Sequence, residues 1–223
     1  MRGLIMDLDG TLVDSVYAHV VAWQQAFAEV GLPIDGFRIH RRFGMSGELL
    51  ARTAAAEAGH PIDLEEGERL QRRHGELYRE LATVRRPLTG AVELLRRLRD
   101  GSVPHAIATS GRGPEIAASL EALGVDRTRA VVVERGDVRR AKPEPDIFEA
   151  CAAKLALPAS ECLVAGDAIW DVVAARRAGM LCVGVLGGGY GEDELVRAGA
   201  FRVYETPGDL AAELDVLGLL SRP

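Results

Sequence analysis

Lysine is almost missing from this sequence: Lys142 and Lys154 are the only two, and arginine supplies the rest of the positive charge. Acids still outnumber bases, and the net charge of −6 argues against a protein that binds nucleic acid. No run reaches the roughly 18 apolar residues that a membrane span needs. An acid follows the short apolar stretch at the N-terminus at once, which makes a poor signal peptide. We therefore expect a cytoplasmic protein whose partner is neither a nucleic acid nor a membrane.

Cysteine is also scarce. Cys151, Cys162 and Cys182 are widely spaced and form no CxxC pair. This spacing argues against both a disulfide framework and a zinc site. Cys162 and Cys182 lie in apolar runs, so we expect them to be small buried hydrophobic residues. Hydrophobic residues make up 48% of the chain, which is enough for a sizeable core.

Short apolar runs alternate with helical patterns along most of the chain. We expect strands at 3–6, 106–108, 130–133, 162–165, 181–185 and 201–204. Helical patterns between them cover 91–99, 114–123, 146–155 and 169–178. Continuously apolar strands that alternate with helices are typical of a parallel sheet covered on both faces. The expected fold class is therefore α/β, with a Rossmann-like, doubly wound parallel sheet.

The first third of the chain breaks this alternation, since no convincing strand occurs between the first and second predicted strands. One apolar stripe at helical spacing runs through Val16, Val20, Trp23, Phe27 and Val30. The segments 48–58 and 64–81 also predict helices. We therefore expect an all-helical cap domain at 15–86, inserted into a core domain formed by 1–14 and 87–223.

Acidic pairs follow two of the predicted strands. Asp7 and Asp9 end the first strand, and Gly10 lets the backbone turn sharply there. Asp167 and Asp171 follow the strand at 162–165 and share one face of the next helix. Helix capping explains one aspartate of that second pair but not both. Because clustered carboxylates are unfavourable without a cation, the two pairs predict a hard-cation site suited to Mg²⁺.

Two further segments are candidates for binding a phosphate. Thr109 and Ser110 end another strand, where hydroxyl groups and turn N–H groups can donate to an anionic oxygen. A simple helix cap is the alternative for this pair. Pro143 and Pro145 are expected to hold the segment after Lys142 extended, which fixes where the lysine points. A point charge on a phosphate is one role for Lys142, and an ordinary surface lysine is the other.

Together these segments resemble the motifs of the haloacid dehalogenase superfamily, in order and approximate spacing. The matching residues are Asp7, Asp9, Gly10, Thr11, Thr109, Lys142, Asp167 and Asp171. The resemblance covers essentially the whole chain. It points to the subfamily with a helical cap after the first motif, to which phosphoglycolate phosphatases and β-phosphoglucomutases belong.

The resemblance implies roles for these residues. Asp7 would be the nucleophile that becomes an aspartyl-phosphate, and Asp9 the general acid and base. Mg²⁺ would be held by the carboxylate of Asp7, the backbone carbonyl of Asp9 and Asp167, with Asp171 acting through water or as an outer partner. The transferring phosphoryl group would be held by Thr109, Ser110 and Lys142.

The expected function is that of a Mg²⁺-dependent phosphatase for a small phosphorylated metabolite, similar to phosphoglycolate or a sugar phosphate. Asp9 argues against dehalogenation, because members with that activity lack the second aspartate. The cap has no lysine for the Schiff base of a phosphonoacetaldehyde hydrolase. A β-phosphoglucomutase is the alternative, since His19 and Trp23 follow Asp9 at a similar spacing, but Gly47 stands where mutases carry an arginine. A non-catalytic phosphate-binding module would lack Asp7 or Asp9, and neither is lost.

Four cap residues are candidates for substrate contact, namely His19, Arg42, Gly44 and Ser46. His19 could equally be a core histidine, and the segment with Gly44 and Ser46 could be a turn with a helix N-cap. The cluster at 40–42 could attract an anion or form a solvated face. The glycines at 187–189 lack GxGxxG spacing and are expected to form a flexible loop. Substrate identity and oligomeric state are left open by the sequence.

Overall fold

Six parallel strands form the sheet in this computed structural model, which describes residues 1–220. The strands are β1 (Gly3–Asp7), β2 (His105–Ala108), β3 (Val131–Val133), β4 (Cys162–Gly166), β5 (Leu181–Val185) and β6 (Arg202–Tyr204). They pair in the order β3-β2-β1-β4-β5-β6, so the winding of the chain reverses between β1 and β4. The expected α/β class with a doubly wound parallel sheet is confirmed.

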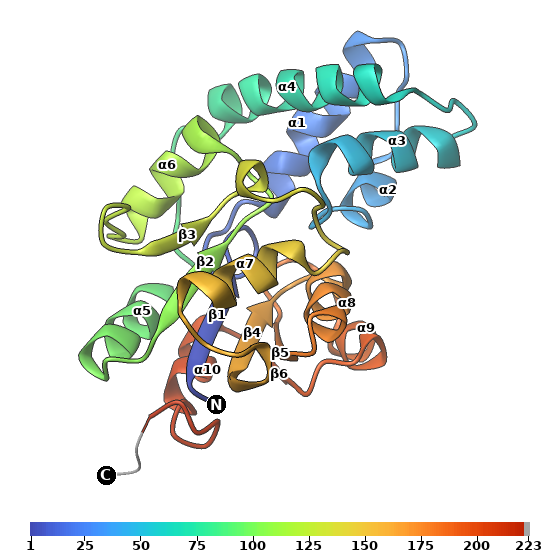
Figure 1. Cartoon of the computed structure of the whole chain (residues 1–223). Coiled ribbons are helices and arrows are strands. Elements are labelled where there is room, and N and C mark those ends of the chain that lie inside the picture. The colour runs from blue at the N-terminus through green and yellow to red at the C-terminus, as the bar shows by residue number, and fades with distance from the viewer. Residues whose placement is uncertain (221–223) are drawn as a thin grey trace.

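The helices cover both faces of this sheet and one of its ends (Figure 1). They are α1 (Val16–Glu29), α2 (Gly36–His40), α3 (Gly47–Glu57), α4 (Leu64–Leu81), α5 (Ala91–Asp100), α6 (Gly113–Ala122), α7 (Asp146–Lys154), α8 (Ile169–Arg177), α9 (Glu192–Ala198) and α10 (Pro207–Ala212). Apolar periodicity did not predict α2, which is only five residues long. No helix within residues 1–220 is long and apolar enough to cross a membrane.

Alternate residues of β1 point to opposite faces of the sheet. Leu4 and Met6 belong to the hydrophobic cluster beneath α5, α6 and α10. Ile5 belongs to the cluster beneath α7 and α8, which also contains Cys162 and Cys182. All five residues are at most 1% exposed, so β1 is a central strand buried on both sides and the two cysteines are the small buried residues expected.

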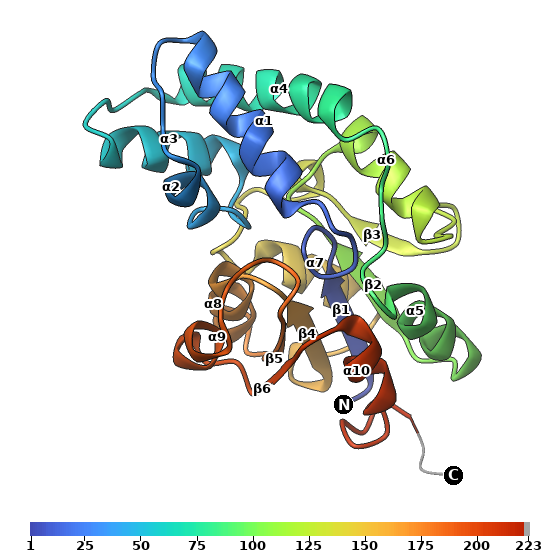
Figure 2. The ribbon, with the colours of Figure 1, turned by 180° about the vertical axis from the view of Figure 1, so that it is seen from behind.

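Helices α1 to α4 form a layer beyond the carboxyl ends of the strands, on the side away from the N-terminus (Figures 1 and 2). They share a hydrophobic cluster of their own, in which Trp23, Phe27 and Tyr78 are buried. Val30 was expected on the same stripe, but it is 40% exposed because α1 ends at Glu29. This helical layer covers the strand ends that carry the acidic pairs.

The chain enters and leaves the helical layer through two segments that lie side by side. Asp14 donates its N–H to the carbonyl of Arg86 at 2.9 Å, and Leu88 donates to the carbonyl of Leu12 at 2.9 Å. Adjacent crossings of this kind suit a hinge between two units. The division into a core and a cap at these crossings stays a prediction, and the last three residues of the expected core lie outside the described chain.

Candidate active site

The two acidic strand ends meet at the centre of the sheet. β1 and β4 are adjacent and parallel, with Met6 opposite Ala165, so Asp7 and Asp167 stand at neighbouring strand ends. Asp171 lies in the first turn of α8. One carboxylate oxygen from each of the three aspartates lies within 4.8 Å of the other two, and all three residues are buried. The sheet thus brings together carboxylates that are far apart in the sequence.

Lys142 is the cation of this cluster. Its Nζ donates to Oδ1 of Asp7 at 2.6 Å and to Oδ1 of Asp171 at 2.8 Å, and the residue is 1% exposed. The segment after Lys142 is a turn, in which Glu144 donates its N–H to the carbonyl of Ala141 at 2.9 Å, so the expected extended conformation was wrong. A lysine buried this deeply needs carboxylate partners to stay charged. The alternative of a surface lysine is therefore excluded.

The remaining hydrogen bonds of the aspartates decide which oxygens are open to a cation. Asp171 uses both of its oxygens, because Oδ2 accepts the N–H of Ala168 at 3.1 Å where α8 begins. Asp167 accepts the hydroxyl of Thr11 on Oδ1 at 2.8 Å. Within the described chain, Oδ2 of Asp7 and Oδ2 of Asp167 accept no hydrogen bond. Asp171 therefore positions Lys142 and starts α8, while the other two aspartates offer free oxygens.

Burial, and then repulsion between neighbouring carboxylates, raise the pKa values of Asp7 and Asp167. Burial raises the pKa of Asp7 to about 7, although Lys142 acts against it. Burial, and then the charge of Asp171, raise the pKa of Asp167 well above its usual range. Buried oxygen donors with uncompensated negative charge fit a hard divalent cation such as Mg²⁺, with water completing its coordination.

The side chain of Asp9 contacts two residues at the start of α1. The hydroxyl of Ser15 donates to Oδ1 of Asp9 at 2.6 Å, and Nε2 of His19 lies 3.4 Å from the same oxygen. Burial alone would raise the pKa of Asp9, but the contacts with His19 and Ser15 outweigh burial and lower it. Asp9 is thus held in the ionised form that a general base requires.

The two phosphate-binding candidates after β2 differ in their surroundings. Thr109 is buried, and its Oγ1 accepts the N–H of Gly111 at 3.0 Å, so it shapes the turn at the strand end. Ser110 lines a cavity of about 50 Å³ between sheet and cap. Asp7 and Lys142 line the same cavity from the sheet side. An anionic group in this cavity would therefore meet a hydroxyl and an ammonium group beside the candidate nucleophile.

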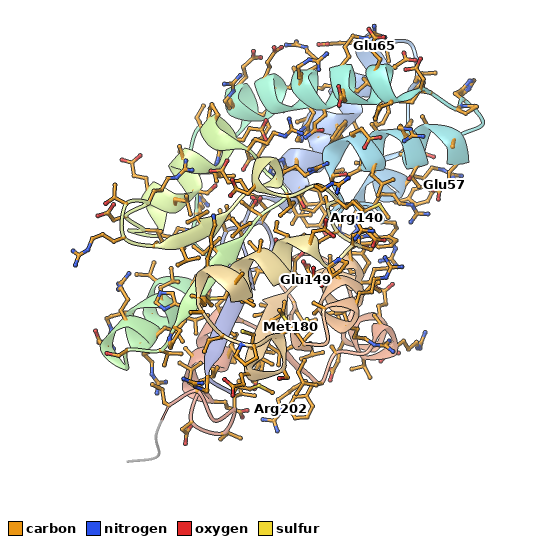
Figure 3. All side chains as sticks on the ribbon, viewed as in Figure 1. Glu57, Glu65, Arg140, Glu149, Met180 and Arg202 are labelled. Carbon is orange, nitrogen blue, oxygen red and sulfur yellow. The ribbon has the colours of Figure 1, made fainter. Side chains whose placement is uncertain are left out.

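Two of the four candidate cap residues, His19 and Gly44, line this cavity. Within the described part of the chain, Arg42 and Ser46 do not. Arg42 forms an ion pair with Glu57, which Figure 3 labels at the outer end of α3. The hydroxyl of Ser46 accepts a backbone N–H at 3.4 Å as the N-cap of α3. Ser46 is therefore explained as a helix N-cap, and Arg42 is explained by its ion pair with Glu57.

Three polar side chains of the cavity have no counterpart among the residues expected from the sequence. They are Gln71 and His74 on α4 and Glu115 on α6. Nε2 of His74 lies 3.0 Å from Nδ1 of His19, and the His74 ring stacks on Trp23 with 4.2 Å between centroids. Apolar periodicity shows which face of a helix is buried, but not which polar residue at its border faces a cavity. A single sequence contains no stronger signal for these three.

The glycines at 187–189 pack tightly between the cap and the acidic cluster. The carbonyl of Gly188 lies 2.7 Å from Nε2 of His40, and a Cβ at Gly188 would collide with Oδ2 of Asp167. Glycine is used here because it allows the backbone to approach the carboxylate closely. The prediction of a flexible loop was therefore wrong.

Segment 40–42 joins the cap to the core. The carbonyl of Arg41 accepts the hydroxyl of Tyr190 at 2.9 Å and the indole N–H of Trp170 at 3.2 Å. The guanidinium of Arg41 forms an ion pair with Glu194 at the start of α9. This segment is thus an interface between the helical layer and the residues that follow β4 and β5, rather than a solvated face.

Comparison with known proteins identifies the family of this chain. Residues 1–179 match the haloacid dehalogenase-like hydrolases. Validoxylamine A 7'-phosphate phosphatase of Streptomyces hygroscopicus subsp. limoneus is 32% identical over 190 residues, covering 81% of this chain and 84% of that protein. β-Phosphoglucomutase of Bacillus subtilis (strain 168) is 30% identical over 220 residues, covering 96% and 93%. The crystal structure of a hydrolase from Pseudomonas syringae has 46% identity and a TM-score of 0.94, covering 97% of this chain and 99% of that one.

The chain belongs to the haloacid dehalogenase-like hydrolase family. The family match confirms the resemblance drawn from the sequence motifs. The solved hydrolase structure confirms the expected fold, and the relatives named as phosphatases confirm the expected enzyme class. A phosphatase and a phosphoglucomutase, the two activities weighed from the sequence, both occur among the relatives.

Proposed function

We propose that this protein is a Mg²⁺-dependent phosphatase that hydrolyses a small phosphorylated metabolite through an aspartyl-phosphate on Asp7. The observation that carries the proposal is the buried cluster of Asp7, Asp167, Asp171 and Lys142 at the edge of a cavity that Asp9 also lines. Nucleophile, acid–base group and phosphate-binding cation are then in one place. Relatives named as phosphatases support the same reading.

In the first step, a carboxylate oxygen of Asp7 attacks phosphorus and the bond to the leaving oxygen breaks. Asp9 donates a proton to that oxygen, so the leaving group departs as an alcohol. The entering phosphate dianion adds negative charge beside Asp9, which favours the protonated form needed for this donation. Lys142 stabilises the charge on the phosphoryl oxygens while the bond changes.

In the second step, water attacks the phosphorus of the aspartyl-phosphate and Asp9 takes its proton. The bond between phosphorus and Asp7 breaks, inorganic phosphate leaves, and the carboxylate is restored. Mg²⁺, held by Asp7, Asp167 and the Asp9 carbonyl, would neutralise phosphoryl charge when bound. The hydroxyl of Ser110 donates to the carbonyl of Gly44 at 3.4 Å, and it would turn from that long contact to donate to the phosphoryl group.

The proposal is tested by measuring phosphate release from a panel of phosphate monoesters with Mg²⁺ and with EDTA. We expect metal-dependent release, and we expect Asp7→Asn to reduce kcat by about 10³-fold or more because the nucleophile is gone while the fold persists. Near wild-type turnover by Asp7→Asn would remove Asp7 as the nucleophile.

A phosphoglucomutase is the second candidate, and one contact favours it. Nε2 of His19 lies 3.4 Å from Oδ1 of Asp9. His19 is the histidine whose position in the sequence after Asp9 suggested a mutase. Conversion of β-glucose 1-phosphate should therefore be followed in parallel with phosphate release. Isomerisation faster than release would assign the protein to the mutase branch.

A further inference from the structure

The cavity continues from the phosphoryl site into a chamber enclosed by the cap. Its apolar wall contains Trp23, Met45 and Leu50. Its polar wall contains Gln71, His74 and Glu115, supplied by α4 of the cap and α6 of the core. The phosphoryl group is held at the strand ends, so this chamber receives the leaving group of the substrate. Its chemistry therefore decides which leaving groups are accepted.

The chamber offers no free cation to a leaving group. Among the lining residues within 1–220, Lys142 is the only lysine or arginine, and its Nζ is bound to Asp7 and Asp171. Burial lowers the pKa of His74 well below its usual value, so this imidazole is neutral. The two ring nitrogens of His19 face Asp9 and His74, so they are directed at protein groups.

Glu115 adds a carboxylate to the same wall. It lies in the first turn of α6 and reaches across to the cap, where a Cβ at Gly75 would collide with its Oε1. The glycine in the middle of α4 therefore makes room for this side chain. Burial raises the pKa of Glu115, while the nearby His19 and then Arg112 act against burial. Within the described chain no salt bridge joins Glu115 to either residue, and Arg112 is exposed and does not line the cavity. Glu115 thus faces the chamber without an ion-pair partner inside it.

We infer that the substrate is a phosphate monoester whose leaving group carries no negative charge, such as a polyol, a sugar or an amine-bearing ring. Mg²⁺ and Lys142 compensate the phosphate, but a second phosphate or a carboxylate would enter the chamber beside Glu115 without a partner. Hydroxyl or ammonium groups can bond to Gln71 and Glu115, and the carbon face of a ring can contact the apolar wall of the chamber. This inference rests on the proposed function. It disfavours phosphoglycolate and bisphosphates as substrates.

The test compares substrates that differ in one charged group. The pairs are 2-hydroxyethyl phosphate against 2-phosphoglycolate, and fructose 1-phosphate against fructose 1,6-bisphosphate. With wild-type protein and Mg²⁺ we expect kcat/KM to favour the uncharged member of each pair by about tenfold or more. This comparison needs no variant, so it does not depend on the folding of a mutant.

Glu115→Gln should reduce the preference in kcat/KM for the uncharged substrates, because it removes the negative charge from the chamber wall. We expect kcat/KM for 2-phosphoglycolate to rise by about threefold or more relative to that for 2-hydroxyethyl phosphate. Glu121→Gln, an exposed change on the same helix, is the matched control and should leave both values unchanged. Metal-dependent turnover that favours 2-phosphoglycolate or the bisphosphate would overturn the inference and leave the proposed phosphatase activity intact. Absence of metal-dependent release from all four esters would overturn both.

Discussion

At the scale of single residues, Lys142 makes the contacts that connect the site, because it binds two of the three buried aspartates. Its ammonium lies between Asp7 and Asp171, and no other cation is within the carboxylate cluster of the described chain. In the proposed mechanism the lysine therefore has two functions, because it lies between two buried carboxylates and would also supply charge to a phosphate.

Lys142→Ala should destabilise the fold by about 3–5 kcal/mol, because it leaves the two carboxylates buried without their partner. Turnover should also fall by about 10³-fold, since charge on the phosphoryl oxygens is no longer balanced. Lys154→Ala is the matched control, because this second lysine is exposed and its ion pair with Asp137, at 3.5 Å, is long and also exposed. Its loss should change the free energy of unfolding by about 0.5 kcal/mol or less. Urea unfolding and steady-state kinetics measure both effects. Equal stabilities for the two variants would contradict the assigned role.

Residues of the site differ in how far the sequence could predict them. Asp7 and Lys142 stand out because acids and a rare lysine follow predicted strands, and parallel strands bring their carboxyl ends together. Glu115 and Gln71 could not be predicted, because their place in the cavity depends on how α6 and α4 pack against each other. Arg42 was a plausible anion ligand by charge alone, but Glu57 neutralises it. Site residues on strand ends were thus accessible to sequence reasoning, whereas those on helices depended on tertiary packing.

At the scale of secondary-structure elements, the loop after β5 supports the acidic cluster directly. Gly188 packs against Oδ2 of Asp167, one of the two oxygens open to a cation. The strands and longer helices followed from hydrophobic patterning, but this loop did not, because three consecutive glycines are equally typical of a mobile segment. Only the packing of the loop against Asp167 and the cap shows that these glycines form a packed loop and not a mobile segment.

Gly188→Ala should displace the carboxylate of Asp167, because the added Cβ collides with it. We expect weaker Mg²⁺ binding, so that activity saturates only at a higher Mg²⁺ concentration. We also expect kcat/KM to fall by about a hundredfold, since small misplacements of catalytic groups have effects of this size. Gly136→Ala is the control, because a Cβ there meets no atom within 4 Å. Activity is titrated against Mg²⁺ for both variants. Identical Mg²⁺ dependence would show that the loop does not position Asp167.

At the scale of the whole molecule, we expect the acidic cluster to make stability depend on pH and on a divalent cation. Burial raises the pKa of Asp7 from an ordinary value of 3.8 to about 7. The folded protein then holds a proton that the unfolded chain releases, so without metal the free energy of unfolding falls as pH rises from about 4 to about 7. A divalent cation bound to the ionised carboxylates would reverse this loss.

Mg²⁺ should therefore raise the Tm by several degrees at pH 8 and by much less at pH 5, where protons occupy the same carboxylates. The measurement is thermal unfolding with Mg²⁺ or with EDTA at each pH. Comparing the two conditions at one pH separates this site from His74, whose lowered pKa changes stability in the opposite direction. A Tm increase as large at pH 5 as at pH 8 would contradict a carboxylate site for the metal.

The helical layer formed by α1 to α4 limits access to the site. A cavity of about 50 Å³ holds only a few water molecules, so a sugar-sized leaving group cannot enter unless the cap moves. The contacts that must break include the hydrogen bond from Tyr190 to the carbonyl of Arg41. The adjacent chain crossings at the base of the cap are the natural place for the movement.

Tyr190→Phe removes that hydrogen bond while keeping the ring. It should favour the open arrangement of the cap by about 1 kcal/mol, which raises the population of that arrangement several-fold. We expect faster amide hydrogen exchange in segments 40–46 and 187–191, with global stability changed little. Tyr204→Phe is the matched control, because its hydroxyl donates at 3.1 Å to Glu213 at the end of α10, and not to a residue of helices α1 to α4. Exchange that rises equally in both variants, or in neither, would show that the Tyr190 contact does not hold the cap closed.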